Sequence, residues 1–362
     1  MAFLSKMYDP GIRSMLIDLT TGCNAACPMC SRTGNPNIED HPDEITLEKF
    51  KQYFPVEFIR QLEVIKFCGN FGDPAFAKDC VAIHQYIDEA NPDITLILHT
   101  NGGLRNRKFW QDLGEVYAKK PNRIIFFHID GLEDTNHLYR VNVNFDVVIK
   151  NAKTAIASGA QCLWAFIPFA HNEHQIEEAE QMAAELGFVA FAVKISGRFD
   201  GWKPFKFYDK KTEIVKSIYP PTSPEFKVDK PLNKTELPVC VAETRRDIYV
   251  DARGNVLPCC WYASSYEDYA EVREILNQWG SINLNERPLI DILKLDLYNG
   301  AIQDIWNGKP TRLSYTCFAK CRNASGTHYW KINENTVSGE EAKWANMKDP
   351  EWLKKNWKFM EE

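Results

Sequence analysis

Residues 14–30 read SMLIDLTTGCNAACPMC, and this stretch decides the fold. Its first six residues are mostly apolar and have the length of a strand, which predicts a buried β-strand. Three cysteines follow within eight residues, at Cys23, Cys27 and Cys30, with the spacing C-x3-C-x2-C. Three thiolates on one short loop can converge on a single metal centre, so this loop is the first candidate site.

The same alternation of a short apolar run and an amphipathic segment continues to about residue 205. We predict strands at residues 14–19, 64–68, 95–99, 124–129, 163–167 and 190–195. We predict crossover helices near residues 47–58, 80–90, 108–117, 145–158 and 175–186. Six βα units indicate an α/β fold with a parallel sheet, either an open or partial barrel or a doubly wound sheet. In both, ligands bind at the carboxyl ends of the strands.

Polar and glycine-rich segments follow the predicted strands at the places where this fold binds ligands. The segment Gly69–Pro74 follows the second strand, Thr100–Gly102 the third, and Asp130-Gly131 the fourth. We therefore expect these segments and the cysteine loop to line one site.

Composition excludes several classes of protein. The formal net charge of −6 and the lack of a basic patch argue against a nucleic-acid partner. No uninterrupted apolar run of about 18 residues is present, which argues against a membrane span, and the N-terminus does not resemble a signal peptide. We expect a cytoplasmic protein. The eleven cysteines are an odd number and fall in clusters, which favours metal binding over a disulfide framework.

The alternation stops in a segment of six prolines between residues 204 and 238, where we predict a bridge with one short helix near residues 212–218. Residues 247–260, DIYVDARGNVLPCC, then predict a hairpin that turns at Gly254. A helical stretch follows it. The predicted organisation is an N-terminal lead (1–14), an α/β domain (15–205), the bridge (206–238), a small α+β domain (239–326) and a tail that packs as a helix or cap (327–362).

A second set of cysteines falls in the small domain, at Cys240, Cys259, Cys317 and Cys321. Four thiolates can hold a closed site, and structural zinc and an iron–sulfur cluster fit equally well on spacing alone. Cys260 is spare or replaces Cys259, because adjacent residues on a strand point to opposite faces. For the first set, zinc held by three cysteines and His41 is the alternative to a cluster.

The motif C-x3-C-x2-C, preceded by Thr20-Thr21-Gly22, resembles that of the radical S-adenosylmethionine (SAM) superfamily over about residues 15–196. The resemblance implies a partial (β/α)6 barrel. It also implies a [4Fe–4S] cluster on Cys23, Cys27 and Cys30 whose fourth iron binds SAM. Such enzymes cleave SAM reductively to a 5′-deoxyadenosyl radical, which abstracts a hydrogen atom from the substrate. No catalytic acid or base is identified.

The resemblance also implies a set of SAM-binding residues at the strand ends. Gly69–Asp73 is similar to the family's glycine-rich segment, although Asp73 stands where Glu is commoner. Arg140 occupies a position where relatives often carry Arg. The expected SAM-binding residues are Gly69, Asn70, Gly72, Asp73, Asn101, His128, Asp130 and Ser196.

Residues 239–322 resemble the twitch form of the SPASM/twitch auxiliary-cluster domain. This resemblance implies one auxiliary [4Fe–4S] cluster on Cys240, Cys259, Cys317 and Cys321, with a role in electron transfer. An electron-accepting cluster favours an oxidative modification of the substrate. The alternative is a SPASM-type maturase, which modifies a peptide by cross-linking, thioether formation or epimerisation. A further alternative belongs to another class of protein, namely a non-catalytic module that binds zinc or an iron–sulfur cluster.

The expected partners are a small-molecule or peptide substrate and an electron donor such as flavodoxin or ferredoxin. About fourteen residues precede the first strand, which leaves no room for an N-terminal peptide-recognition domain and counts against a peptide without excluding it. The sequence identifies neither the substrate, the reaction outcome nor the oligomeric state.

Overall fold

The computed structural model describes residues 11–35, 38, 42–199, 202–209, 212–226, 240–268, 270–307, 309, 316–317, 321 and 330–332. The chain divides into two compact units. The first unit comprises residues 1–22, 36–98 and 230–326, and the second comprises residues 23–35, 99–229 and 327–362. None of the described helices has the length and apolar character needed to cross a membrane.

The six predicted strands are all present, each within two residues of its expected ends. They are β1 (Ser14–Ile17), β2 (Val64–Phe67), β3 (Thr95–Thr100), β4 (Arg123–His128), β5 (Gln161–Phe166) and β6 (Ala190–Lys194). The helices between them are α3 (Leu47–Tyr53), α4 (Val56–Gln61), α5 (Cys80–Ala90), α6 (Arg107–Ala118), α7 (Asn136–Tyr139), α8 (Phe145–Ala157) and α9 (Ile176–Leu186). Because each strand is followed by a helix, neighbouring strands run parallel.

In the first unit the strand order is β10-β9-β1-β2-β3. Here β9 (Asp247–Val250) pairs parallel to β1, and β10 (Val256–Leu257) pairs antiparallel to β9. Segments more than 200 residues apart in the sequence therefore share one sheet. The hydrophobic side chains of β1 and β2 that face α5 are fully buried, and the ring of Phe67 contacts His84 of that helix.

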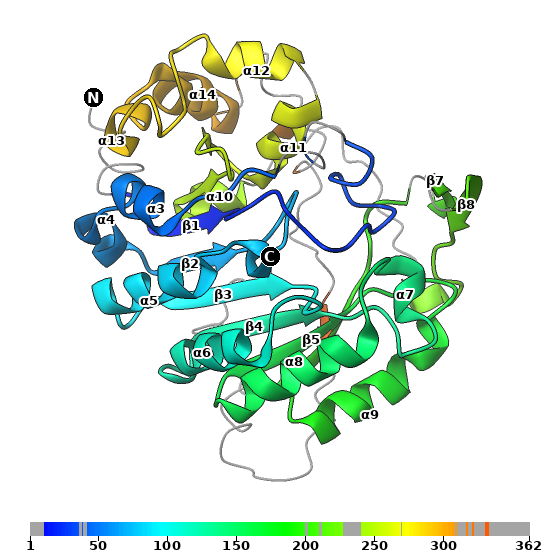
Figure 1. Ribbon diagram of the computed structural model, residues 1–362. Coiled ribbons are helices and arrows are strands. Elements are labelled where there is room, and N and C mark those ends of the chain that lie inside the picture. The colour runs from blue at the N-terminus through cyan, green and yellow to red at the C-terminus, as the bar shows by residue number, and fades with distance from the viewer. Residues whose placement is uncertain are drawn as a thin grey trace. The chain divides into compact units, whose positions relative to one another are not determined.

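In the second unit the strand order is β4-β5-β6-β11, with β11 (Trp330–Ile332) antiparallel to β6. Helices α6, α8 and α9 pack against β4, β5 and β6 (Figure 1). Asn106 and Asn144 cap α6 and α8 by accepting from backbone amides, and Gly187 ends α9 with a φ of 86°. Side-chain caps and glycine thus set the helix ends that the sequence predicts.

The predicted hairpin at residues 247–260 is confirmed as β9 and β10. Its turn contains Gly254 with a φ of 87°, a conformation that glycine adopts without strain. The elements around it are α10 (Val241–Arg245), α11 (Cys260–Asp268), α12 (Ala270–Asn277), α13 (Leu289–Ile292), a π-helical turn (Leu297–Ala301) and α14 (Ile302–Trp306). The last three confirm the predicted helical stretch.

Three local predictions were wrong. The segment 212–218 is not a helix, because β8 (Ile214–Ile218) pairs antiparallel with β7 (Phe205–Asp209). The helix expected at 47–58 is split into α3 and α4 by Pro55, which lacks the amide hydrogen that a continuous helix needs. Cys260 begins α11 and Cys259 directly precedes it, so neither lies on a strand, since β10 ends at Leu257.

Some expectations concern residues outside the described part of the chain. His41 and most of the predicted tail are among them, and of residues 327–362 only β11 is described. The predicted domain borders at residues 14, 205, 238 and 326 stay a prediction.

Candidate functional site

The loop that carries Cys23, Cys27 and Cys30 follows β1 and lies in the second unit. A turn closes it, because the amide of Cys30 donates to the carbonyl of Cys27 at 3.0 Å. The Cys23 sulfur accepts from the amide of Ala25 at 3.4 Å and from the side-chain amide of Asn101 at 3.5 Å. Donors directed at sulfur favour a thiolate over a thiol, so this arrangement suits metal-bound cysteines.

Cys27 is the buried member of the three, and it lies beside an ion pair. Burial raises the pKa of its thiol to about 11, while the charge of Arg140 opposes this shift. The Arg140 guanidinium is 3.7 Å from the Cys27 sulfur, and its Nε donates to Asp130 Oδ2 at 2.7 Å. Asp130 also accepts from the amide of Ile167 at 2.7 Å. It therefore holds a cation beside the sulfur, where it compensates the negative charge of a thiolate centre.

Asn101, at the end of β3, ties down the cysteine loop. Its Nδ2 also donates to Asn24 Oδ1 at 3.0 Å, and its Oδ1 accepts from the amide of Gly103 at 2.8 Å. Both ends of this buried side chain are engaged. Asn101 thus positions Cys23 relative to the strand end.

His128 and Ser196, both expected to bind SAM, lie at the ends of β4 and β6. His99 of β3 is next to His128, with its Nδ1 2.9 Å from His128 Nε2, so one ring donates to the other. Burial and the charges of His99 and Arg140 lower the pKa of His128 well below 6.5, and its imidazole is neutral at physiological pH. The half-buried Ser196 hydroxyl accepts from the amide of Arg198 at 3.3 Å.

The glycine-rich segment lies in the first unit and packs against the backbone that follows β1. A Cβ on Gly72 would lie 2.0 Å from the carbonyl oxygen of Thr20, and a Cβ on Gly69 would lie 1.4 Å from the carbonyl oxygen of Gly72. No side chain larger than hydrogen fits at either position without moving the backbone. Close packing of two loops requires these glycines, whatever ligand they contact.

Asn70 and Asp73, between and after these glycines, bind other parts of the first unit. The amide of Asn70 donates to Asp18 Oδ2 at 3.1 Å, and its side chain donates to the carbonyl of Cys260 at 3.1 Å. Asp73 Oδ1 accepts from the amide of Ala75 at 3.0 Å and caps the short helix that follows. Both residues therefore hold the glycine-rich segment in place.

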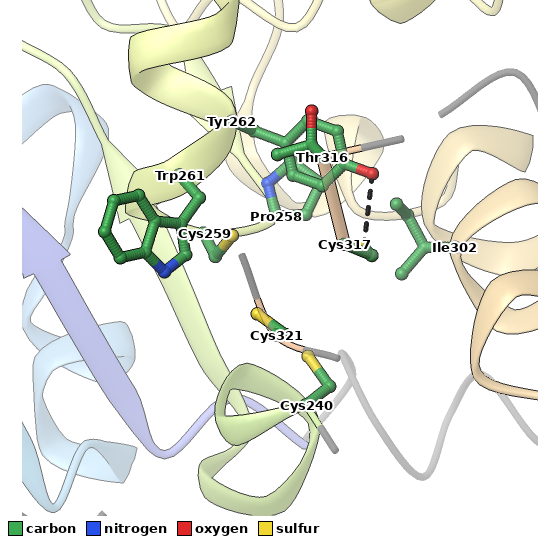
Figure 2. Close-up of a pocket in the computed structure, with 9 residues that line it drawn as sticks. All are labelled: Cys240, Pro258, Cys259, Trp261, Tyr262, Ile302, Thr316, Cys317 and Cys321. Carbon is green, nitrogen blue, oxygen red and sulfur yellow. Dashed lines mark hydrogen bonds between the residues drawn. The ribbon is translucent and has the colours of Figure 1, made fainter. Parts of the chain in front are cut away.

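One pocket in the first unit gathers all four cysteines of the second predicted set (Figure 2). They come from separate segments: Cys240 precedes α10, Cys259 precedes α11, and the other two lie beyond α14. The pocket is lined by Cys240, Pro258, Cys259, Trp261, Tyr262, Ile302, Thr316, Cys317 and Cys321. Apart from the sulfurs, the lining is mostly aromatic and aliphatic.

The thiols of this pocket affect one another's pKa values, and one of them contacts a tyrosine. Burial, together with the charges of Cys260, Cys240 and Cys321, raises the pKa of Cys259 well above its usual value. The Tyr262 hydroxyl lies 3.4 Å from the sulfur of Cys317, which also lines the pocket (Figure 2). Cys259 lines the pocket and its neighbour Cys260 does not.

A single metal ion needs protein ligands that lie close together. Nowhere in the described part of the chain do three His, Cys, Asp or Glu side chains lie close enough to share one metal ion. Thiolates around one zinc ion are about 3.8 Å apart, given tetrahedral Zn–S bonds of about 2.3 Å. A four-iron cluster is wider than a single ion and accepts a more open set of ligands.

Several residues of these sites escaped sequence reasoning. His99 had a weak signal, as a polar residue near the end of a predicted strand. Tyr262 had none, because its contact with Cys317 joins residues 55 apart. Arg140 was noted only by position, and its contact with Cys27 joins residues 113 apart. Contacts of this range depend on the folded chain.

The sequence was compared with protein families and with curated proteins. Residues 17–185 match the family model described as the Radical SAM superfamily. This range includes the cysteine loop, the glycine-rich segment and the four strands β2 to β5. No curated protein sequence matches the chain.

Solved structures show the same fold at low sequence identity. Streptococcus suis SuiB bound to S-adenosylmethionine is 16% identical with a TM-score of 0.53, and the match covers 81% of this chain and 68% of that chain. SuiB bound to precursor peptide SuiA is 18% identical with a TM-score of 0.51, covering 80% and 66%. Native anSMEcpe with bound AdoMet and Cp18Cys peptide is 13% identical with a TM-score of 0.51, covering 96% and 97%.

These comparisons agree with the architecture described above. The predicted α/β fold with a mostly parallel sheet is confirmed, and it is consistent with a partial barrel. At such low identity the structural likeness concerns the fold alone, whereas the family match rests on the sequence itself. Residues 17–185 are therefore similar to the Radical SAM superfamily, whose members are enzymes.

Proposed function

We propose that the chain is a radical SAM oxidoreductase with one SAM-binding [4Fe–4S] cluster and one auxiliary [4Fe–4S] cluster. The ligands of the first are Cys23, Cys27 and Cys30, and those of the second are Cys240, Cys259, Cys317 and Cys321. The observation that carries the proposal is the single pocket that four cysteines line from separate segments. When bound, the first cluster and SAM supply a 5′-deoxyadenosyl radical that removes a hydrogen atom from the substrate.

At the first centre the chain would supply three thiolates to a four-iron cluster, fewer than its four irons, and SAM would complete the site. Asn101 and the amide of Ala25 donate to Cys23 and hold its sulfur in place. The Arg140–Asp130 ion pair keeps a positive charge next to Cys27, at 3.7 Å from its sulfur. Burial of this pair excludes water from one side of the centre.

At the second centre four thiolates leave no open iron, which suits electron transfer better than substrate ligation. The mostly apolar lining limits contact with solvent. Solvent exposure is one of the factors that set the reduction potential of an iron–sulfur cluster. An acceptor of this kind fits an oxidation in which the substrate loses a hydrogen atom and then an electron. The reaction would be an oxidative modification, with electrons supplied by a donor such as flavodoxin or ferredoxin in the reducing cytoplasm.

Metal analysis tests the proposal against a non-catalytic zinc module. Anaerobically purified protein should hold about eight irons and about eight sulfides per chain, as two four-iron clusters require. One or two zinc ions per chain and no sulfide would contradict the proposal.

Variants separate the roles of the two centres. Reductant and SAM should release 5′-deoxyadenosine from the wild type, and alanine at Cys23, Cys27 and Cys30 should abolish the release. Alanine at Cys317 and Cys321 should remove about four irons and spare SAM cleavage more than product formation. Equal loss of both activities in the second variant would count against an electron-relay role.

A second candidate is modification of a peptide, as in a SPASM-type maturase. It is favoured by two of the similar structures, which contain a precursor peptide in one case and the Cp18Cys peptide in the other. Incubation of the loaded enzyme with reductant, SAM and a size-fractionated cell extract distinguishes the two. A mass change in a peptide of the larger fraction supports this candidate, and a change confined to small molecules supports the first.

A further inference from the structure

The hairpin of β7 and β8, in the second unit, presents exposed hydrophobic side chains. Neither strand pairs with another described strand, so the two form a sheet of their own (Figure 1). Four of the eight exposed large hydrophobic side chains in the described part of the chain lie between residues 208 and 219. Single exposed hydrophobic residues are normal on a protein surface, whereas a group of neighbours marks a binding site.

The strand register gathers most of these side chains on one face. Tyr208 of β7 pairs directly with Val215 of β8, and they are 60% and 66% exposed. Side chains alternate between faces along a strand, so the paired residues Lys206 and Ser217 lie on this face as well. These four residues form the β7–β8 face. Tyr219, which is 55% exposed, directly follows β8.

The hairpin is basic, although the chain as a whole is acidic. Residues 203–216 contain five lysines and two acidic residues, whereas the chain has a formal net charge of −6. Lys216 is paired with Asp209 at 2.5 Å, while Lys203 and Lys206 are exposed. The net charge of the chain repels an acidic protein and the hairpin attracts it. Electrostatic steering therefore directs an acidic partner to this face.

A second copy of the chain fits the β7–β8 face less well than an acidic partner does. In a two-fold dimer the same patch meets itself, so lysines of both copies would face one another. Like charges that meet across an interface oppose binding.

Both ends of the hairpin are anchored to other parts of the second unit. Arg198, in the segment between β6 and β7, donates to the carbonyl of Met29 in the cysteine loop. After β8, the carbonyl of Tyr219 accepts from the amide of Ala170 at 3.2 Å, in the segment that follows β5. A partner that binds the hairpin is therefore held on the unit that contains Cys23, Cys27 and Cys30.

We propose that the β7–β8 face is the docking site of an acidic electron-donor protein, such as a flavodoxin or a ferredoxin. This inference rests on the proposed function. The donor loses one electron, the cluster held by Cys23, Cys27 and Cys30 gains it, and no bond forms or breaks in this step. A small face of hydrophobic residues and lysines suits such a partner, because electron-transfer complexes have small interfaces and charge speeds their association.

Binding measurements test the site without turnover. The full-length, anaerobically purified protein is titrated with an oxidised acidic flavodoxin and, separately, with an oxidised acidic ferredoxin, and isothermal titration calorimetry gives the Kd. At least one donor should bind. Its Kd should rise several-fold between about 0.01 M and about 0.1 M salt, where the screening length falls from about 30 Å to about 10 Å.

Variants of the β7–β8 face locate the contact. Tyr208→Thr combined with Val215→Thr should raise the Kd about tenfold, because threonine keeps the strand propensity and removes apolar surface. The exposed substitution Lys206→Glu should raise it about fivefold and reduce its salt dependence. The matched controls are Ile290→Thr, at a side chain of α13 that is 41% exposed, and Lys153→Glu on the surface of α8. Neither control should change the Kd.

Absence of binding by both donors, or a Kd that neither variant of the face changes, would overturn the proposal. A wild-type dimer, detected by sedimentation, that dissociates in the Tyr208→Thr/Val215→Thr variant would also overturn it, because the face would then bind a second copy. Release of 5′-deoxyadenosine with dithionite as the reductant tests the proposed function separately, since binding of an oxidised donor needs neither SAM nor turnover.

Discussion

At the scale of single residues, the cysteine sulfurs are surrounded by groups that set their charge and position. Arg140 links Asp130 to Cys27, Asn101 donates to Cys23, and Tyr262 contacts Cys317. Each of these neighbours is far from its cysteine in the sequence. Each contact can be removed by one substitution that keeps the shape of the side chain.

The ion pair between Asp130 and Arg140 should be important for stability. The Asp130→Asn variant leaves the Arg140 charge, whose side chain is 15% exposed, without its counter-charge. We expect a loss of about 3–5 kcal/mol in the free energy of unfolding, measured by urea denaturation. In the exposed pair Lys108–Asp112, the variant Asp112→Asn should cost less than about 1 kcal/mol. Similar losses in both variants would show that burial of the first pair has no effect.

Tyr262 should raise the reduction potential of the auxiliary cluster. Its hydroxyl can donate to the Cys317 thiolate at 3.4 Å, and this bond is stronger when the cluster gains an electron. The variant Tyr262→Phe should lower the midpoint potential by roughly 20–60 mV, the equivalent of one hydrogen bond. Redox titration followed by electron paramagnetic resonance measures the shift.

Tyr298→Phe is the matched control for this potential. The Tyr298 hydroxyl donates to the carbonyl of Val256 at 2.7 Å, and Tyr298 does not line the cysteine pocket. Its loss should lower stability and leave the potential unchanged. Equal shifts of the potential in both variants would refute a specific role for Tyr262.

At the scale of elements, loops after the strands are held together by backbone contacts that leave no space for side chains. The segment after β2 packs on the segment after β1, and Gly69 and Gly72 allow this approach. The amide of Asp73 donates to the carbonyl of Gly22 at 2.9 Å, immediately before the first cysteine of the loop. The segment that leads into the cysteine loop is therefore held by a part of the chain that is distant from it in the sequence.

The variant Gly72→Ala tests this dependence. Its Cβ would lie 2.0 Å from the Thr20 carbonyl oxygen, so the two segments must separate. We expect a loss of about 2–4 kcal/mol in the free energy of unfolding and a lower iron content of the purified protein. At Gly197 a Cβ meets nothing within 4 Å, and Gly197→Ala should change neither quantity. Normal iron content in the Gly72 variant would refute the coupling of the two segments.

At the scale of the whole molecule, segments from both ends of the chain build the first unit. The pairing of β9 with β1 joins Asp247 to Ser14, and the auxiliary pocket uses residues from 240 to 321 of the same unit. The chain therefore needs its C-terminal third to complete the sheet that begins at β1. Folding of this unit requires contacts of long range, which form slowly.

Global stability should decrease as the pH rises, because of Asp18. Burial raises the pKa of this carboxyl from 3.8 to about 8 in the folded protein, so the folded state binds a proton that the unfolded state releases. Its contribution to stability is complete below pH 3.8 and is lost as the pH rises to about 8.

The variant Asp18→Asn isolates this effect, because an amide resembles the protonated carboxyl. The variant and the wild type should have similar free energies of unfolding near pH 4, close to the unfolded pKa of 3.8. At about pH 8 the variant should be more stable by a few kcal/mol, because each pH unit between the unfolded and folded pKa values contributes about 1.4 kcal/mol. Urea denaturation at both pH values measures the difference, and a difference that does not change with pH would be inconsistent with a neutral buried Asp18.

Local patterns in the sequence were sufficient for the parallel strands, the hairpin and the two sets of cysteines. Strand positions follow from apolar runs, and the hairpin turn follows from Gly254. Predictions failed where local preference competed with a partner: Ile214–Ile218 looked helical but pairs with β7. The break in the helix predicted at 47–58 has a local cause, because Pro55 lacks the amide hydrogen that a continuous helix needs.

The sequence by itself therefore determined the order of strands and helices, the family of the domain and the identity of the cysteines, because these depend on residues close together in the chain. The tertiary structure decided which groups surround the cysteines. It placed Arg140 at Cys27 and Tyr262 at Cys317. These contacts join residues that are 55 and 113 positions apart, and only packing of the sheet and its helices fixes them.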